Sequence, residues 1–124
     1  MQYAMLVYHH EADFHSLPPE EQNRLRNACA DWYSQLEATG RASGAMRLQP
    51  TVTAPTLREQ NGKLVLSDGP FAETKEILAG LVVLECQDLD EAIAQARRFP
   101  SIPAGFSLEL RPIIPDGVRR SDQP

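Results

Sequence analysis

The stretch that decides the fold is AGLVVLEC at residues 79–86, followed one residue later by DLDE at residues 88–91. Apart from Glu85, the first stretch is apolar at both parities, as expected of a strand buried on both faces. We therefore place it at the centre of a sheet. Asp88 and Glu91, three residues apart, form a capping-box variant that opens an amphipathic helix. This helix should end before Pro100, and the side chains predicted to face inward are Leu89, Ala92, Ile93 and Ala96.

Before this stretch, the sequence of residues 2–40 predicts a strand followed by a long helix. The short apolar run QYAMLVY at residues 2–8 is typical of a buried strand. Pro18 and Pro19, followed by two glutamates, indicate a helix start, because proline is tolerated in the first turn and acids favour the positive end of the helix dipole. The helix should end at Gly40, and its apolar stripe consists of Leu25, Ala28, Cys29, Trp32 and Leu36.

The middle of the chain predicts a further strand and a hairpin. GAMRLQ at residues 44–49 is the strand, and TVTAPTLRE (51–59) and KLVLS (63–67) form a hairpin across the tight-turn pair Asn61-Gly62. Pro55 has no backbone N–H, so the hairpin should be peripheral. With a last strand at residues 106–113, the order predicts an α+β fold, a ferredoxin-like βαββαβ unit with an inserted β-hairpin.

A second copy of the chain is expected to complete the core. Two helices can cover one face of this sheet, yet residues 2–8 and 79–86 are apolar on both faces. A second sheet packed against the uncovered face would bury it, and two-fold dimers are the commonest soluble assemblies. We therefore predict a homodimer that forms a dimeric α+β barrel.

Length and composition narrow the class of protein. The 124 residues fit one domain, assigned to residues 1–115, with a flexible tail at 116–124. A net charge of −5 disfavours nucleic acid as a partner. The longest apolar run is far shorter than the ~20 residues of a membrane-spanning helix, and no signal segment opens the chain, so we expect a cytoplasmic protein without a membrane partner. Cys29 and Cys86 lack CxxC spacing and are expected to be reduced core residues rather than a disulfide.

The stretch SDGPFAETKEILAGLVVLECQDLDEAIAQARRFP at residues 67–100 resembles the DGPF-domain branch of the YCII-related family. The resemblance extends to MQYAMLVYHHEA at the start of the chain and to the closing strand. It implies the same ferredoxin-like dimer. It also implies a family of mostly unknown function, whose members are often encoded beside extracytoplasmic-function sigma factors and some of whose wider relatives are proposed to use a His and Asp pair. Leu81 stands where many members carry an aromatic residue.

Asp68 and one histidine are the candidate catalytic residues. If the end of the strand before it opens onto a cavity, Asp68 could act as a general base or orient a histidine; alternatively, its carboxylate only caps the DGPF turn, in which Gly69 supplies a conformation closed to other residues. His9 and His10 should point to opposite faces, and we select His9 for the pocket, although sequence alone does not assign the faces. An exposed loop histidine without a role is the alternative.

Other polar residues are candidates to bind a ligand or a metal ion. Phe71, Glu73 and Lys75 follow Asp68 directly and are candidates to line a pocket, the alternative being a solvated charged loop. Arg47 is a candidate to bind an anionic ligand, the alternative being a surface arginine. The string HHE, with Asp13 and His15 beyond it, contains metal-ligating residue types, but adjacent ligands on a strand diverge, so we expect no metal and no other cofactor.

Two functions follow as hypotheses. The first is a small-molecule-binding protein, an enzyme of cofactor-free proton-transfer or lyase-like chemistry using Asp68 and His9 in a cavity between the sheets. The second is a non-catalytic regulatory or sensory module that works with an extracytoplasmic-function sigma factor system. A concave pocket shared by Asp68 and a histidine would favour the enzyme, whereas an Asp68 wholly engaged in its own turn would favour the module. An exposed apolar patch that remains after dimerisation would strengthen the module hypothesis.

Overall fold

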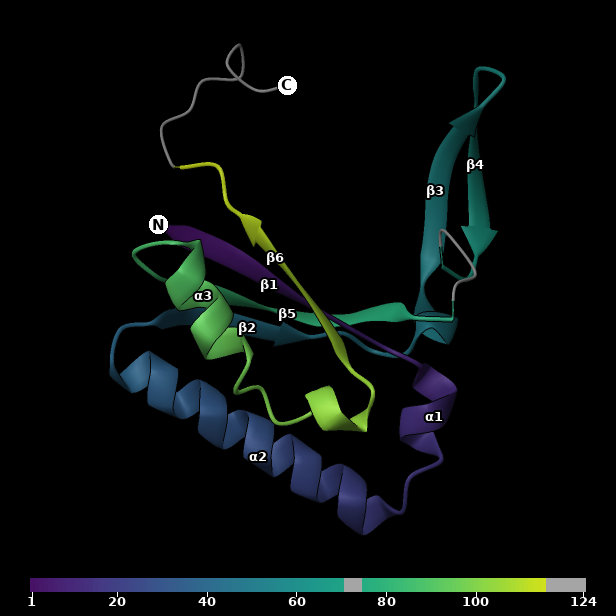
Figure 1. The fold of residues 1–124 in the computed structure, drawn as a ribbon. Coiled ribbons are helices and arrows are strands. Elements are labelled where there is room, and N and C mark those ends of the chain that lie inside the picture. The colour runs from purple at the N-terminus through teal and green to yellow at the C-terminus, as the bar shows by residue number, and fades with distance from the viewer. Residues whose placement is uncertain (71–74, 116–124) are drawn as a thin grey trace.

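The computed structural model describes residues 1–70 and 75–115, which form two antiparallel sheets and three α-helices (Figure 1). The main sheet has the strand order β2-β5-β1-β6. Its strands are β1 (Gln2–His9), β2 (Ala42–Arg47), β5 (Ile77–Glu85) and β6 (Ser107–Pro112). The second sheet pairs β3 (Pro55–Gln60) with β4 (Lys63–Asp68). The helices are α1 (Glu11–His15), α2 (Pro19–Ala38) and α3 (Leu89–Ala96), with two short 3-10 turns at Thr51–Thr53 and Ile102–Ala104.

Helices α2 and α3 lie on the same side of the main sheet, and the core fills the space beneath them (Figure 1). Strand alternation sends Met5 into this core, beside Val82 of β5 and Leu110 of β6. The indole N–H of Trp32 donates to the backbone oxygen of Gln95 at 3.1 Å, which joins α2 to α3. We call this side of the sheet the covered face; its buried members in β1 and β5 are Tyr3, Met5, Val7, His9, Gly80, Val82 and Leu84.

The opposite side of the sheet, the open face, carries no helix of the described chain. Its apolar members are only half-buried; they are Ala4, Leu6, Tyr8, Leu81 and Val83. The strand at 79–86 was predicted to be buried on both faces only when a second copy of the chain covers the sheet. In the single chain, the helices cover one face and the other stays half-buried. The strand's central position is confirmed, since β5 lies between β2 and β1.

Several local predictions are confirmed. Helix α2 has prolines at its start, and its buried residues Leu25, Trp32 and Leu36 lie on the predicted stripe. Asn61 and Gly62 both have positive φ, 50° and 77°, as a two-residue hairpin turn requires. The side chain of Asp88 accepts a hydrogen bond from the backbone N–H of Glu91 at 2.9 Å and so caps α3.

Other local predictions are corrected. The polar stretch after β1 forms the short helix α1, which the sequence analysis did not anticipate because it has no apolar periodicity. Thr51–Thr53 is a 3-10 turn, and the first hairpin strand begins only at Pro55. Leu89 was predicted to face inward but is 45% exposed, because it is the first residue of α3, before the buried stripe of Ala92 and Ala96.

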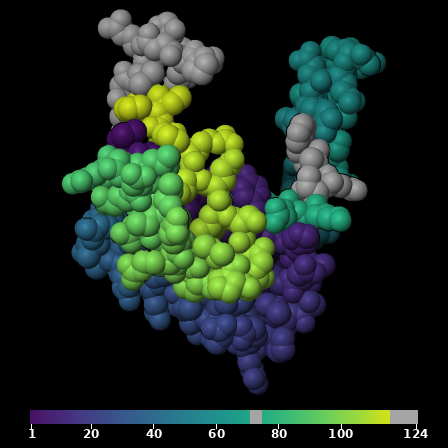
Figure 2. Space-filling view, in the orientation of Figure 1, coloured from purple at the N-terminus to yellow at the C-terminus, as the bar shows by residue number. Residues whose placement is uncertain are grey.

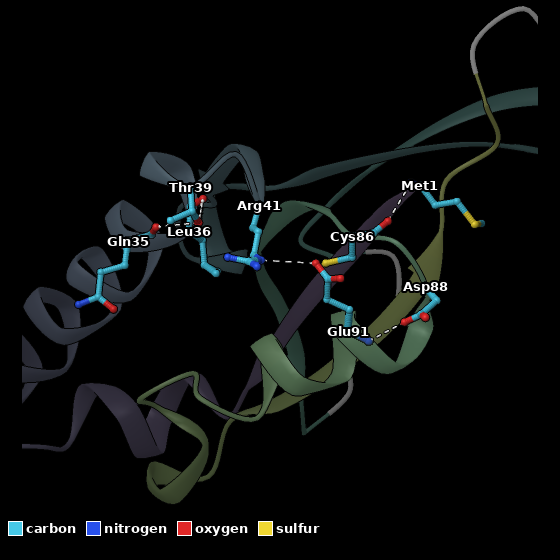
Figure 3. Close-up of polar contacts among 8 residues, drawn as sticks. All are labelled: Met1, Gln35, Leu36, Thr39, Arg41, Cys86, Asp88 and Glu91. Atoms are coloured by element: carbon cyan, nitrogen blue, oxygen red, sulfur yellow. Dashed lines mark hydrogen bonds and ion pairs between the residues drawn. The ribbon is translucent and has the colours of Figure 1, made fainter.

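Polar contacts join the end of α2 to the start of α3 (Figure 3). Arg41, just past α2, lies 3.5 Å from the carboxylate of Glu91 in α3. The Thr39 hydroxyl donates to the backbone oxygens of Gln35 and Leu36, which satisfies carbonyls at the helix C-terminus. The ammonium group of Met1 donates to the backbone oxygen of Cys86 at 2.8 Å. This end of the molecule is therefore closed by backbone and charged contacts.

The hairpin of β3 and β4, which we call the arm, extends from the body in the direction away from α2 (Figure 1). The space-filling view shows it standing apart from the strands and helices of the body (Figure 2). This position confirms that the hairpin is peripheral. Leu57 and Leu66 face each other across the arm and are 61% and 68% exposed, and Leu64 on the same face is 73% exposed. None of the helices in the described ranges is long and apolar enough to cross a membrane.

Candidate functional site

A cavity of about 380 Å³ lies between α2 and the covered face, at the end of the sheet where β1 runs into α1. Its walls are mostly apolar and aromatic, as is typical of small-molecule sites. The residues that form these walls include Val7, Phe14, Leu25, Trp32, Phe99 and Phe106. A few polar side chains converge on the same space, among them His9, Glu11, Cys29 and Arg47.

His9 is the last residue of β1 and lies on the covered face, as Val7 does. Its ring therefore points toward the helices and lines the cavity. It is 8% exposed, and its Nδ1 atom has no hydrogen-bond partner among residues 1–70 and 75–115. The ring packs against Phe106 at 4.8 Å and against Phe14 at 5.5 Å between centroids. Burial lowers the pKa of His9, with Glu11 opposing and His15 and His10 reinforcing the shift. The imidazole is therefore held neutral at neutral pH.

Glu11 opens α1 next to His9, and its carboxylate is already engaged. One oxygen accepts from the backbone N–H of Thr51 at 2.7 Å, and the other accepts from the Thr51 hydroxyl at 2.8 Å. The backbone hydrogen bond from Thr51 is the main reason that the pKa of Glu11 is lowered. Glu11 is therefore an ionised structural link between α1 and the segment leading into the arm.

Cys29 and Ser101 meet at the helix side of the cavity. Their Sγ and Oγ atoms lie 3.1 Å apart, although the two residues are far apart in sequence. Ser101 is 2% exposed, and Cys29 is half-buried on α2. Burial raises the pKa of the Cys29 thiol, against the lowering effects of Ser101 and Arg47. Cys29 is thus a protonated thiol at neutral pH, and both it and Cys86 are free cysteines.

Arg47 is the last residue of β2 and belongs to the covered face. It pairs with Gly80 of β5, and Gly80 pairs with Val7 of β1 on its other side. A Cβ atom at position 80 would come within 2.5 Å of the Met46 backbone oxygen and 3.4 Å of the Arg47 Cα. Only glycine allows β2 to approach β5 this closely. Gly80 therefore sets the position of Arg47 at the cavity.

The structure places the other predicted site residues elsewhere. Asp68 is exposed at the end of β4, opposite Pro55 in the arm, and does not line the cavity that holds His9. Gly69 after it has φ 94°, so the predicted turn conformation is confirmed. Phe71 and Glu73 lie outside the described residues. Lys75 lies in a separate, open depression with Tyr8, His10 and Glu76.

The cavity also contains residues that the sequence analysis did not select for a site. Glu11 and Phe14 belong to the unanticipated α1, and Ser101 follows α3 in a loop with no motif. For this cavity, only the pair His9 and His10 could be recognised from local sequence. Adjacent strand residues point to opposite faces, so one of the two histidines must lie on the covered face. In the described part of the chain, no group of three or more His, Cys, Asp and Glu side chains is arranged to hold a metal ion.

Comparison with known sequences identifies the class of protein. The sequence model of the YCII-related domain matches residues 1–115. The chain therefore belongs to the YCII-related family. It is also 40% identical over 115 residues to an uncharacterized protein of Rhizobium meliloti (strain 1021), an alignment that covers 91% of this chain and 92% of that protein.

Proposed function

We propose that this protein binds a small molecule in the cavity beside His9 and that His9 is a polar contact for it inside the cavity. The observation that carries the proposal is the unpartnered Nδ1 atom of a residue that is only 8% exposed. A buried polar atom without a partner destabilises the fold by about 1–3 kcal/mol, so a partner from outside the chain, an ordered water or a ligand, is expected at this atom. A ligand that fills an apolar cavity and meets Nδ1 would supply that partner.

The chemistry that suits this site is cofactor-free proton transfer. A neutral imidazole can accept a proton from a bound molecule, and its lowered pKa keeps it ready to do so at neutral pH. In this proposal His9 is the general base. The Asp68 partner of the sequence hypothesis is replaced by Glu11, whose charge favours the protonated ring and which lines the same cavity.

We further propose that the active species is a ferredoxin-like homodimer in the cytoplasm, of the DGPF-domain branch. The antiparallel order β2-β5-β1-β6, with both long helices on one side, supports the ferredoxin-like assignment. The apolar residues of the open face support pairing with a second copy. The run Asp68-Gly69-Pro70, followed in sequence by Phe71, supports the branch.

The test compares wild type with His9→Phe in a thermal-shift screen of small organic molecules, since a ligand of the folded state raises Tm. Phenylalanine keeps an aromatic ring between Phe14 and Phe106 but removes the buried polar atom. We expect unliganded His9→Phe to melt at the same temperature as wild type or higher, and to lose its ligand-induced shifts. His10→Phe is the matched control, because His10 does not line the cavity. Ligand shifts that survive unchanged in His9→Phe would refute the role of His9.

A regulatory module remains a second candidate because the arm carries an exposed apolar face. Leu57, Leu64 and Leu66 are each more than half exposed, and such patches mark interaction sites. A protein partner of a sigma factor system would bind there without using the cavity. Changing Leu57 and Leu66 to serine, while leaving the cavity intact, would then abolish partner binding but leave small-molecule shifts unchanged.

A further inference from the structure

The charged groups that line the cavity are Glu11, Arg26 and Arg47, and two of them are already engaged. The Glu11 carboxylate accepts both hydrogen bonds from Thr51. The Arg26 guanidinium lies over the Phe14 ring, 5.4 Å from its centroid. Arg47 has no ion pair or hydrogen bond from its side chain within residues 1–70 and 75–115, although the chain has 17 acidic residues.

The neutral polar groups of the cavity are largely engaged as well. Cys29 contacts Ser101, and the Tyr33 hydroxyl donates to the Glu37 carboxylate at 2.9 Å. The exposed ring of His15 packs edge-on against Phe14. Gln49 and His15 are exposed, and Arg26 stacks on Phe14 through the face of its guanidinium. Of the remaining polar groups, Arg47 and the Nδ1 atom of His9 are open to a ligand.

The positive charge of Arg47 acts on the interior of the cavity. It lowers the pKa of Cys29, in opposition to burial, although Arg47 itself is exposed. Val7, Gly80 and Arg47 are aligned across three adjacent strands, and His9 is two residues beyond Val7. From strand spacing and rise, the Cα atoms of His9 and Arg47 are roughly 12 Å apart. Both residues line the same cavity of about 380 Å³.

We infer, on the basis of the ligand cavity proposed above, that the natural ligand is a small organic anion. Its acidic group, a carboxylate or a group of similar geometry, pairs with Arg47 at the mouth, and its apolar body lies among Phe14, Phe99 and Phe106. A guanidinium binds a carboxylate through two parallel hydrogen bonds, which selects anions over neutral molecules of the same shape. His9 then contacts the far side of the body.

The experiment compares two probes of nearly equal shape, 2-naphthoate and 2-naphthamide, which differ in charge. Their dissociation constants are measured by calorimetry for wild type, Arg47→Gln, Arg47→Lys and Arg24→Gln. We expect wild type to bind naphthoate about tenfold or more tightly than naphthamide, the strength of a charge-assisted hydrogen bond. Arg47→Gln should remove this preference and leave naphthamide affinity unchanged, and Arg47→Lys should keep part of it.

Arg24→Gln is the matched control, because it changes the net charge equally at an exposed arginine of α2 that pairs with Glu21. An equal loss in Arg24→Gln would mean that only overall charge matters, and it would overturn the role of Arg47. Equal binding of both probes to wild type would overturn the anion inference but leave the proposed cavity function standing. Failure of both probes to bind would also overturn the anion inference, whereas the cavity function is decided separately by the comparison of wild type with His9→Phe. Far-ultraviolet circular dichroism and Tm of each variant establish that it is folded.

Discussion

The two faces of the main sheet are built from alternate residues of the same strands, yet they differ in burial. On the covered face, Met5 and Leu84 are 0% exposed. On the open face, their neighbours Leu6 and Val83 are equally apolar but only half-buried. The comparison teaches that burial here is decided by what lies over a residue, not by its own hydrophobicity. The sequence encodes more apolar surface than one copy of the chain can cover.

The largest effect is expected from truncating the covered face. Met5→Ala should lower the free energy of unfolding by about 2–5 kcal/mol, because it removes a fully buried side chain and leaves a cavity. Leu6→Ala on the open face should lower it clearly less at protein concentrations where the chain is monomeric. Urea unfolding measured by tryptophan fluorescence gives both values. Equal losses for the two variants would contradict the difference in coverage.

A charge on the open face tests whether a second copy covers it. Leu81→Lys should leave the fold intact but shift the species from dimer to monomer, because a lysine cannot be buried between two apolar sheets without a partner for its charge. Sedimentation velocity over a range of concentrations measures the change. The control is Ala38→Lys, at an exposed position at the end of α2. A wild-type chain that sediments as a monomer would remove the basis for the dimer.

The smallest expected effect separates the two histidines at the end of β1. Burial lowers the pKa of His9 below its ordinary value of 6.5. The unfolded chain therefore binds a proton more readily than the folded one at this residue. The stability that comes from burying a neutral His9 is fully present above about pH 6.5, and it is lost as pH falls toward the lowered pKa of the folded state. His9→Asn should therefore flatten the pH dependence of stability as pH falls below about 6.5.

The measurement is the free energy of unfolding from urea titrations at several pH values, with His10→Asn as the control for removing a histidine. His10 lies on the other parity, half-buried and 3.5 Å from the Asp13 carboxylate. A His9→Asn curve that keeps the wild-type slope would show that His9 does not titrate as a buried group.

Much of the fold could be predicted because its signals are local. The prolines and apolar stripe of α2, the Asn61-Gly62 turn and the Asp88 cap each depend on residues a few positions apart. Helix α1 was missed because its stability comes from contacts beyond its own residues, notably that of Glu11 with Thr51. Five residues without an apolar stripe carry no periodic signal.

The site was less predictable because it depends on long-range packing. Arg47 and His9 could be named as candidates from residue type, but their common cavity follows from strand register and from the close approach at Gly80. The contact of Cys29 with Ser101 joins a helix to a loop that no motif connects. Asp68 drew attention through its motif, and its place in the arm could be assigned only once the hairpin was located.

The two hydrogen bonds between Glu11 and Thr51 have a mechanical consequence. Thr51 begins the turn that leads into the arm, and Glu11 begins the helix that walls the cavity beside His9. A displacement of this turn would therefore either break both bonds or move α1 with it. Such a displacement would then reach the end of β1, because α1 begins two residues after that strand ends.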